Sequence, residues 1–126
     1  MAYIGDLIAL SVAQNLAAAG VAPSTTDTGK PNMSSLSGFK PTRAMVFVNV
    51  TAIAGTTPSL AVSLEYSADD GATFAAPDTA QTFAAITTTK KTFAVFNLAW
   101  ERFRLSYNLT GTTPTATVSA SVILLP

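Results

Sequence analysis

The sequence predicts an all-β protein, an antiparallel two-sheet β-sandwich or jelly-roll-like fold of about seven to nine strands. Three observations support this prediction. Apolar and polar residues alternate with a period of two along several stretches, turn-forming residues separate these stretches, and no stretch after Ala22 has helical spacing. The 126 residues also suffice to bury a core without disulfides. We therefore expect one β-sandwich domain over residues 1–126.

The first 22 residues are mostly apolar, and we expect them to form an N-terminal arm or first strand. Residues 7–13 are the expected strand, and a short helix over 12–19 is the alternative because Ala and Leu favour helices. No Lys or Arg precedes the apolar stretch, so it does not resemble a signal peptide. It is also too short and too polar to span a bilayer.

Residues 23–42 are rich in Ser, Thr, Gly and Pro, which favour turns and loops. We expect a loop-rich connection there, with short strands near 22–28 and 33–36. The strongest strand signals follow in residues 43–126, which we expect to hold the core. Strands are predicted over 43–53, 59–67, 92–98, 101–109 and 115–125, with a weaker one over 81–85. The side chains expected to be almost fully buried are Val62, Leu64, Phe103, Leu105, Val118 and Val122.

The tetrapeptide Gly-Thr-Thr-Pro occurs twice, at 55–58 and 111–114, and each copy lies between two alternating stretches. Glycine can adopt the positive φ that a chain reversal needs, and proline fixes φ and removes a ladder donor. We therefore expect two similar hairpins, over 43–67 and 101–125. Their structural turn residues would be Gly55, Pro58, Gly111 and Pro114.

Residues 67–74, SADDGATF, fit the pattern S-x-D-x-G-x-T-[FW] of an Asp-box, which resembles repeats found in sialidases and other propeller proteins. The chain has one copy and is too short for a propeller. We expect a structural turn in which Asp69 caps backbone N–H groups and Gly71 takes a positive φ. Calcium binding by Asp69 and Asp70 is the alternative, although calcium requires six or more oxygen ligands.

The composition argues against catalysis and against nucleic-acid binding. The chain has no Cys and no His, so it lacks a thiolate nucleophile and the commonest general base and metal ligand. Seven basic residues balance seven acidic ones, which leaves no excess of positive charge for phosphate groups. We expect no enzymatic activity, no cofactor or metal, and neither a nucleic acid nor a membrane as partner.

Two stretches, FVNVTAIAGTTPSLAVSLEYSADDGATF and FRLSYNLTGTTPTATVSASVI, resemble small virion structural proteins of tailed bacteriophages. The resemblance extends from residue 43 to the end of the chain, and its motifs are turn motifs. It implies a β-sandwich or jelly-roll-like unit that is added to the outside of a capsid as a decoration (cement) protein, often a homotrimer. The partner would be the major capsid protein, and no catalytic residues carry over.

This hypothesis places the protein on the outer capsid surface of a virion that assembles in the host cytoplasm. Two alternatives remain open. One is a tail or baseplate structural adaptor of the virion. The other is a carbohydrate- or receptor-binding β-sandwich module, which would need aromatic side chains exposed on a sheet face. The candidates are Trp100, Phe96 and Tyr3, although we expect Phe96 to lie in the core.

Two groups of residues are candidates for contacts with a partner. The first lies on the outward face of a predicted strand, where charges can also serve to block edge-to-edge aggregation. The second lies in the apolar arm 1–22, which must pair into the sheet or be covered by another subunit. We expect this arm to pack at least in part against a neighbouring copy or the capsid protein. The candidate residues are Trp100, Arg102 and Arg104 in the first group and Tyr3, Ile4 and Leu7 in the second.

Overall fold

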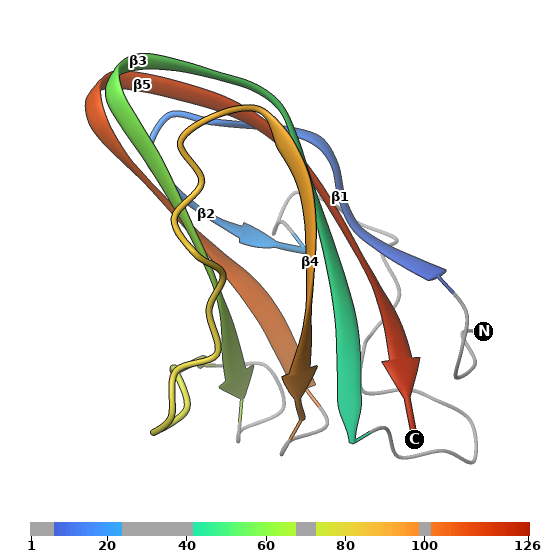
Figure 1. Cartoon of the computed structure of the whole chain (residues 1–126). Helices are drawn as coiled ribbons and strands as arrows, with labels where there is room; N and C mark the ends of the chain where they lie inside the picture. Colours follow the sequence, from blue (N-terminus) through green and yellow to red (C-terminus); the bar gives the residue numbers. More distant parts are fainter. Residues whose placement is uncertain (1–6, 24–41, 68–72, 99–101) are drawn as a thin grey trace.

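The computed structural model describes residues 7–23, 42–67, 73–98 and 102–126. These residues form one antiparallel sheet of five strands in the order β1-β5-β3-β4, with β2 also paired to β5 (Figure 1). No helix occurs in these four ranges, so the prediction of an all-β antiparallel protein is confirmed. The strands are β1 (Leu7–Leu16), β2 (Ala19–Ala22), β3 (Arg43–Ser67), β4 (Lys90–Asn97) and β5 (Arg102–Leu125).

Strands β3 and β5 are each more than 20 residues long and pair with each other along their whole length. The register runs from Arg43 opposite Leu125 to Ser67 opposite Arg102. The prediction of two separate hairpins over 43–67 and 101–125 is therefore wrong. Each expected hairpin is a single strand that continues through its Gly-Thr-Thr-Pro segment. The two strands pair with each other on both sides of that segment, with register shifts between Val50 and Ala52 and between Ala54 and Ser59.

The two Gly-Thr-Thr-Pro segments face each other and bend the β3–β5 ribbon. Gly55 has φ 118° and Gly111 has φ 131°, a backbone region that residues with a Cβ rarely adopt. A Cβ on Gly55 would lie 2.9 Å from Pro114 Cα, and one on Gly111 would lie 3.1 Å from Pro58 Cα. The predicted positive φ at both glycines is thus confirmed, but it produces a pair of facing bulges instead of a hairpin turn.

The bend divides the sheet into two arms that fold toward each other (Figure 1). The β1/β4 arm comprises β1, β4 and residues 43–54 and 115–125. The β2 arm comprises β2 and residues 59–67 and 102–110, and residues 73–89 run along its edge. Residues 73–89 join this edge through isolated bridges at Leu60–Ile86, Ser63–Thr82 and Tyr66–Ala75. The strand predicted over 81–85 is therefore a bridged edge segment.

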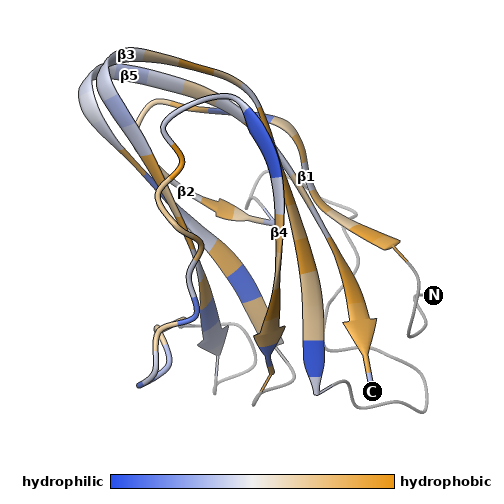
Figure 2. Cartoon of the chain, in the orientation of Figure 1, coloured by the Kyte–Doolittle hydropathy of each residue, from blue (hydrophilic) through white to orange (hydrophobic). Residues whose placement is uncertain are grey.

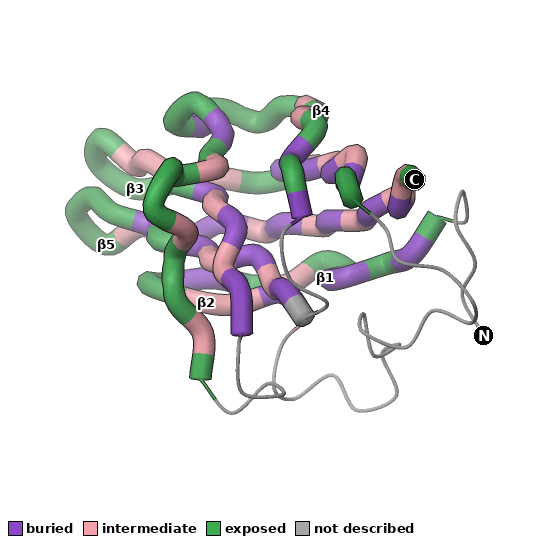
Figure 3. Tube along the Cα trace, turned by 90° about the horizontal axis from the view of Figure 1, so that it is seen from below, coloured by how far each residue is buried: buried purple, intermediate pink, exposed green. Residues whose placement is uncertain are grey.

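The hydrophobic core lies between the two arms, and along most of β3 and β5 purple buried positions alternate with pink, partly exposed ones (Figure 3). All six side chains predicted to be almost fully buried are 0–4% exposed, which confirms the expected inward faces. Several contacts connect the arms, among them hydrogen bonds of Tyr66 and Gln81 with the backbone of Asn97. Two further contacts join side chains of the two arms. Ser11 Oγ and Tyr107 Oη are 3.0 Å apart, and the rings of Phe83 and Phe96 meet edge to face with centroids 5.3 Å apart.

The N-terminal arm is a strand of this sheet, so the helix alternative over 12–19 is wrong. β1 pairs with β5 from Leu7 opposite Ile123 to Leu16 opposite Ala116. Ile8, Leu10 and Leu16 are 0–6% exposed and belong to the core of the same chain. The N-terminal segment had to pair into the sheet or be covered by another subunit. Between Leu7 and Leu16, pairing into the sheet is observed.

Candidate interaction surface

The outer face of the β1/β4 arm carries a row of apolar side chains across four strands. Alternation places Ala44 and Val46 in the core and therefore turns Met45 outward. Through the strand register, Met45 lies beside Ile123 of β5 and Val95 of β4, and Ile123 lies beside Leu7 of β1. Four apolar side chains thus form one continuous cross-strand row on the outside of the arm.

A second apolar pair lies next to this row. Phe47 of β3 is opposite Phe93 of β4, and their ring centroids are 6.1 Å apart. The side chains on this surface that remain most open to solvent are Leu7, Phe93 and Val95, at 66%, 62% and 45% exposure. We call this surface the outer apolar face; its members are Leu7, Met45, Phe47, Phe93, Val95 and Ile123.

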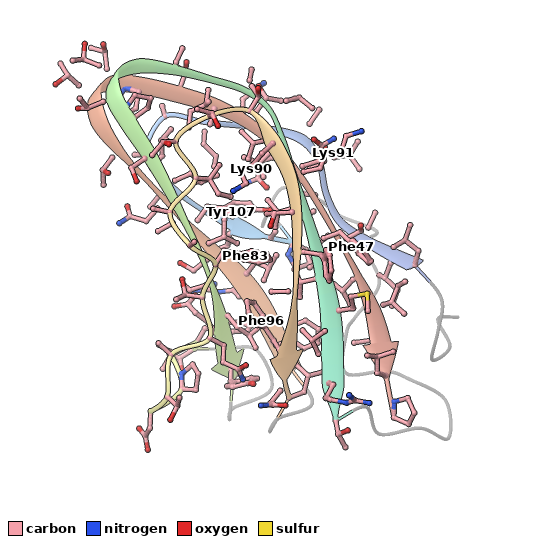
Figure 4. All side chains as sticks on the ribbon, viewed as in Figure 1. Phe47, Phe83, Lys90, Lys91, Phe96 and Tyr107 are labelled. Atoms are coloured by element: carbon pink, nitrogen blue, oxygen red, sulfur yellow. The ribbon has the colours of Figure 1, made fainter. Side chains whose placement is uncertain are left out.

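Positive charge lies at both ends of the outer apolar face. Arg43 is two residues before Met45 on β3, and Lys91 is two residues before Phe93 on β4 and opposite Asn49. Figure 4 shows Phe47 and Lys91 on the outer side of the arm, whereas Lys90 points the other way. The six-residue offset from Arg43 to Asn49 corresponds to about 20 Å of strand. The described residues of this arm include no Asp and no Glu.

The corresponding face of the β2 arm is polar, although it is built from the same two strands. Ser63 is opposite Ser106, and Glu65 is opposite Arg104. The Arg104 Nε–H donates to Glu65 Oε1 over 2.9 Å, and the guanidinium lies 4.2 Å from the Phe74 ring centroid. Figure 2 shows hydrophilic bands on this arm, and more continuous hydrophobic colour on the β1/β4 arm.

These contacts locate the candidate residues named from the sequence. Leu7 lies on the outer apolar face, and Arg104 is engaged by Glu65 and Phe74 of its own chain. Phe96 is 4% exposed in the core, as expected, so it offers no ring for stacking on a ligand. The backbone of Arg102 pairs with Ser67 at the start of β5. Tyr3, Ile4, Asp69, Asp70, Gly71 and Trp100 lie outside the described residues.

The sequence reasoning missed most of the outer apolar face. Residues 43–53 and 92–98 have apolar side chains on both faces, a pattern typical of strands covered on two sides. In the structure one of those sides packs on the core and the other faces outward. The apolar side chains on both faces were therefore visible in the sequence. They did not show whether the second face is covered by another layer of the same chain or by a partner.

The titratable groups of the described chain are few, and one of them is strongly shifted. Burial raises the pKa of Tyr107 to about 12, and the hydrogen bond with Ser11 opposes this rise. Tyr107 is completely enclosed by the core, so its hydroxyl has no access to a substrate. Within the described ranges, no three His, Cys, Asp or Glu residues cluster in a way that could hold a metal ion. No helix in those ranges could cross a membrane.

Comparison with protein-family models, with curated proteins and with solved structures finds no match for this chain.

Proposed function

We propose that this protein is a structural component of a tailed-bacteriophage virion, a decoration (cement) protein that binds the outer surface of the major capsid protein shell. The motif resemblance over residues 43–126 suggests the class of virion protein. The observation that carries the binding role is the outer apolar face, because soluble monomers rarely leave a contiguous apolar surface uncovered. Binding to the assembled shell alone would stabilise the shell by mass action.

The proposed fold is a jelly-roll-like β-sandwich in which β3 and β5 each contribute to both layers. The β1/β4 arm would be one layer and the β2 arm, with residues 73–89 at its edge, the other. The core packed between the arms and the Ser11–Tyr107 and Phe83–Phe96 contacts support this description. Such a rigid unit suits a role that depends on surface contact.

The proposed mechanism involves contacts between subunits and no chemistry, so we propose no enzymatic activity. The protein would act as a homotrimer placed where neighbouring capsid subunits meet, on the outside of the particle. A covered apolar face excludes water, and each 100 Å² of apolar surface removed from water contributes about 2.5 kcal/mol before the costs of association.

The location of the protein on purified particles tests this proposal. We expect antibodies raised against the chain to label the whole outer shell in electron micrographs. Particles stripped of the protein should lose their contents at a lower temperature than decorated particles, and adding the purified protein back should restore the difference. Label confined to the tail would favour the adaptor alternative. Particles without label would contradict a virion role.

A further inference from the structure

The outer apolar face can be compared with the outer face of the β2 arm, which is built from the same two strands. β3 and β5 present Ser63, Ser106 and the Glu65–Arg104 pair to the outside in the β2 arm. The same strands present Met45, Phe47 and Ile123 to the outside in the β1/β4 arm. Exposure to solvent therefore explains the polar outer face of the β2 arm, but it does not explain the outer apolar face.

We infer that the outer apolar face docks on a second protein whose surface has an apolar strip with carboxylates at its two ends, positioned to meet Arg43 and Lys91. The inference rests on the proposed function in one respect: if the protein decorates a capsid, the partner surface belongs to the capsid shell. The proposed chemistry of the partner follows from the face itself, whose apolar centre lies between Arg43 and Lys91, two positions separated by about 20 Å of strand.

A second copy of this chain does not fit this face. Two copies packed through it would bring Arg43 and Lys91 of one copy near the same cations of the other. The described residues of the β1/β4 arm offer no carboxylate to neutralise them. Like charges in such an interface cost several kcal/mol, so the charge pattern favours a different, acidic protein.

A lipid surface fits less well than a protein. Recognition of anionic membranes depends on clusters of about four to eight Lys or Arg residues. The outer apolar face has only Arg43 and Lys91 among the described residues, and they lie at opposite ends. The polar side chain of Asn49 also adjoins the face next to Lys91, which suits hydrogen bonding to a protein surface.

The first experiment uses an anionic naphthalene-sulfonate dye, which combines an aromatic ring with a negative charge and does not depend on capsid binding. We expect the native protein to bind it, and Phe93→Ser and Lys91→Glu each to weaken binding at least fivefold. Asn108→Glu is the control, since Asn108 is exposed on β5 in the β2 arm and also gains a carboxylate, with a charge change of one unit against two for Lys91→Glu. Circular dichroism would verify that every variant is folded. Equal dye binding by all the variants would overturn the inference.

The second experiment measures co-sedimentation with shells of purified major capsid protein. We expect Phe93→Ser and Lys91→Glu to raise the Kd at least tenfold and Asn108→Glu to leave it unchanged. If the native protein binds the dye at this face but does not bind shells, the capsid role fails and the chemical match stands. If the native protein binds shells and none of the face variants weakens that binding, the inference fails and the capsid role stands.

Three further measurements decide between possible occupants of the face. Dimerisation that Phe93→Ser abolishes in the analytical ultracentrifuge would assign the face to a second copy. Binding to phosphatidylcholine–phosphatidylserine vesicles that Phe93→Ser abolishes would assign it to a membrane. A tenfold gain in dye binding after deletion of residues 1–6 would assign it to that segment. Each of these results would overturn the inference, and the absence of all three supports it.

Discussion

The two arms of the sheet share two strands and one core, yet their outer faces differ in polarity. On the β2 arm, serines and an ion pair follow one another on the outside of β3 and β5. On the β1/β4 arm, the same two strands turn Met45, Phe47 and Ile123 outward, with Ser121 opposite Phe47 as a polar neighbour. Both arms satisfy the same requirement for an apolar inner face, so the difference does not arise from folding this core. This contrast is the basis of our proposal that a partner covers the outer apolar face.

The largest difference in stability should be between a substitution on the inner side of the sheet and one on its outer side. Phe103→Ala removes a ring that is 4% exposed in the core and should cost about 3–5 kcal/mol of unfolding free energy. Phe93→Ala removes a ring that is 62% exposed and should cost less than about 1 kcal/mol. Urea denaturation of both variants measures these costs. Similar losses in the two variants would contradict the view that the outer face is uncovered in the isolated chain.

The next largest effect should come from the bend that separates the arms. Gly111→Ala places a Cβ at φ 131° and about 3.0 Å from the carbonyl oxygens of Thr56 and Thr57. The backbone strain alone costs of the order of 1–3 kcal/mol, and the collision adds to it. Gly55→Ala should behave alike because the two contacts are reciprocal, whereas Thr112→Ala, at an exposed position, should change little. Thermal denaturation checks the set, and a neutral Gly111→Ala would rule out the facing bulges.

A pH-dependent effect should arise from the hydrogen bond between Ser11 and Tyr107, one of those that connect the arms. The pKa of Tyr107 is about 12 in the folded protein against about 10 for an ordinary tyrosine, so the folded state retains the proton longer. The stability that this group contributes is therefore complete below pH 10 and is lost as the pH rises toward 12, by at most about 2.7 kcal/mol.

Tyr107→Phe isolates this effect. At pH 8 it should cost about 1 kcal/mol, because the buried Ser11 hydroxyl loses its partner. Above pH 10 the native protein should lose stability faster than the variant, so the difference between them should shrink and disappear at about pH 11. Urea denaturation at pH 8 and pH 11 gives both values. Parallel stability profiles for the two proteins would contradict the assignment.

The smallest effect should come from the polar outer face. The Glu65 and Arg104 side chains are 20% and 28% exposed, so their ion pair is partly screened by solvent. A double-mutant cycle with Glu65→Ala and Arg104→Ala should give a coupling of about 0.3–1 kcal/mol that decreases in 1 M salt. A coupling of several kcal/mol would mean that this face is stabilised as strongly as the core.

Much of the local structure was predictable from the sequence, whereas the strand partners were not. Alternation with a period of two fixes which side chains share a face, so Val62, Leu105 and Val122 were assigned to the core correctly. The same alternation is compatible with a hairpin at each Gly-Thr-Thr-Pro segment and with one long β3–β5 ribbon. Pairing between distant segments depends on the whole ladder, and no local pattern contains that information.

The sequence by itself determined the strand faces, the glycines that must take positive φ and the absence of histidine and cysteine chemistry. Only the tertiary structure decided that both glycines lie at one bend, and that Met45, Phe47 and Phe93 meet outside the sheet. The physical reason is that an apolar side chain favours burial whatever covers it. Which surfaces the chain covers itself depends on how its strands pair and where the sheet folds over.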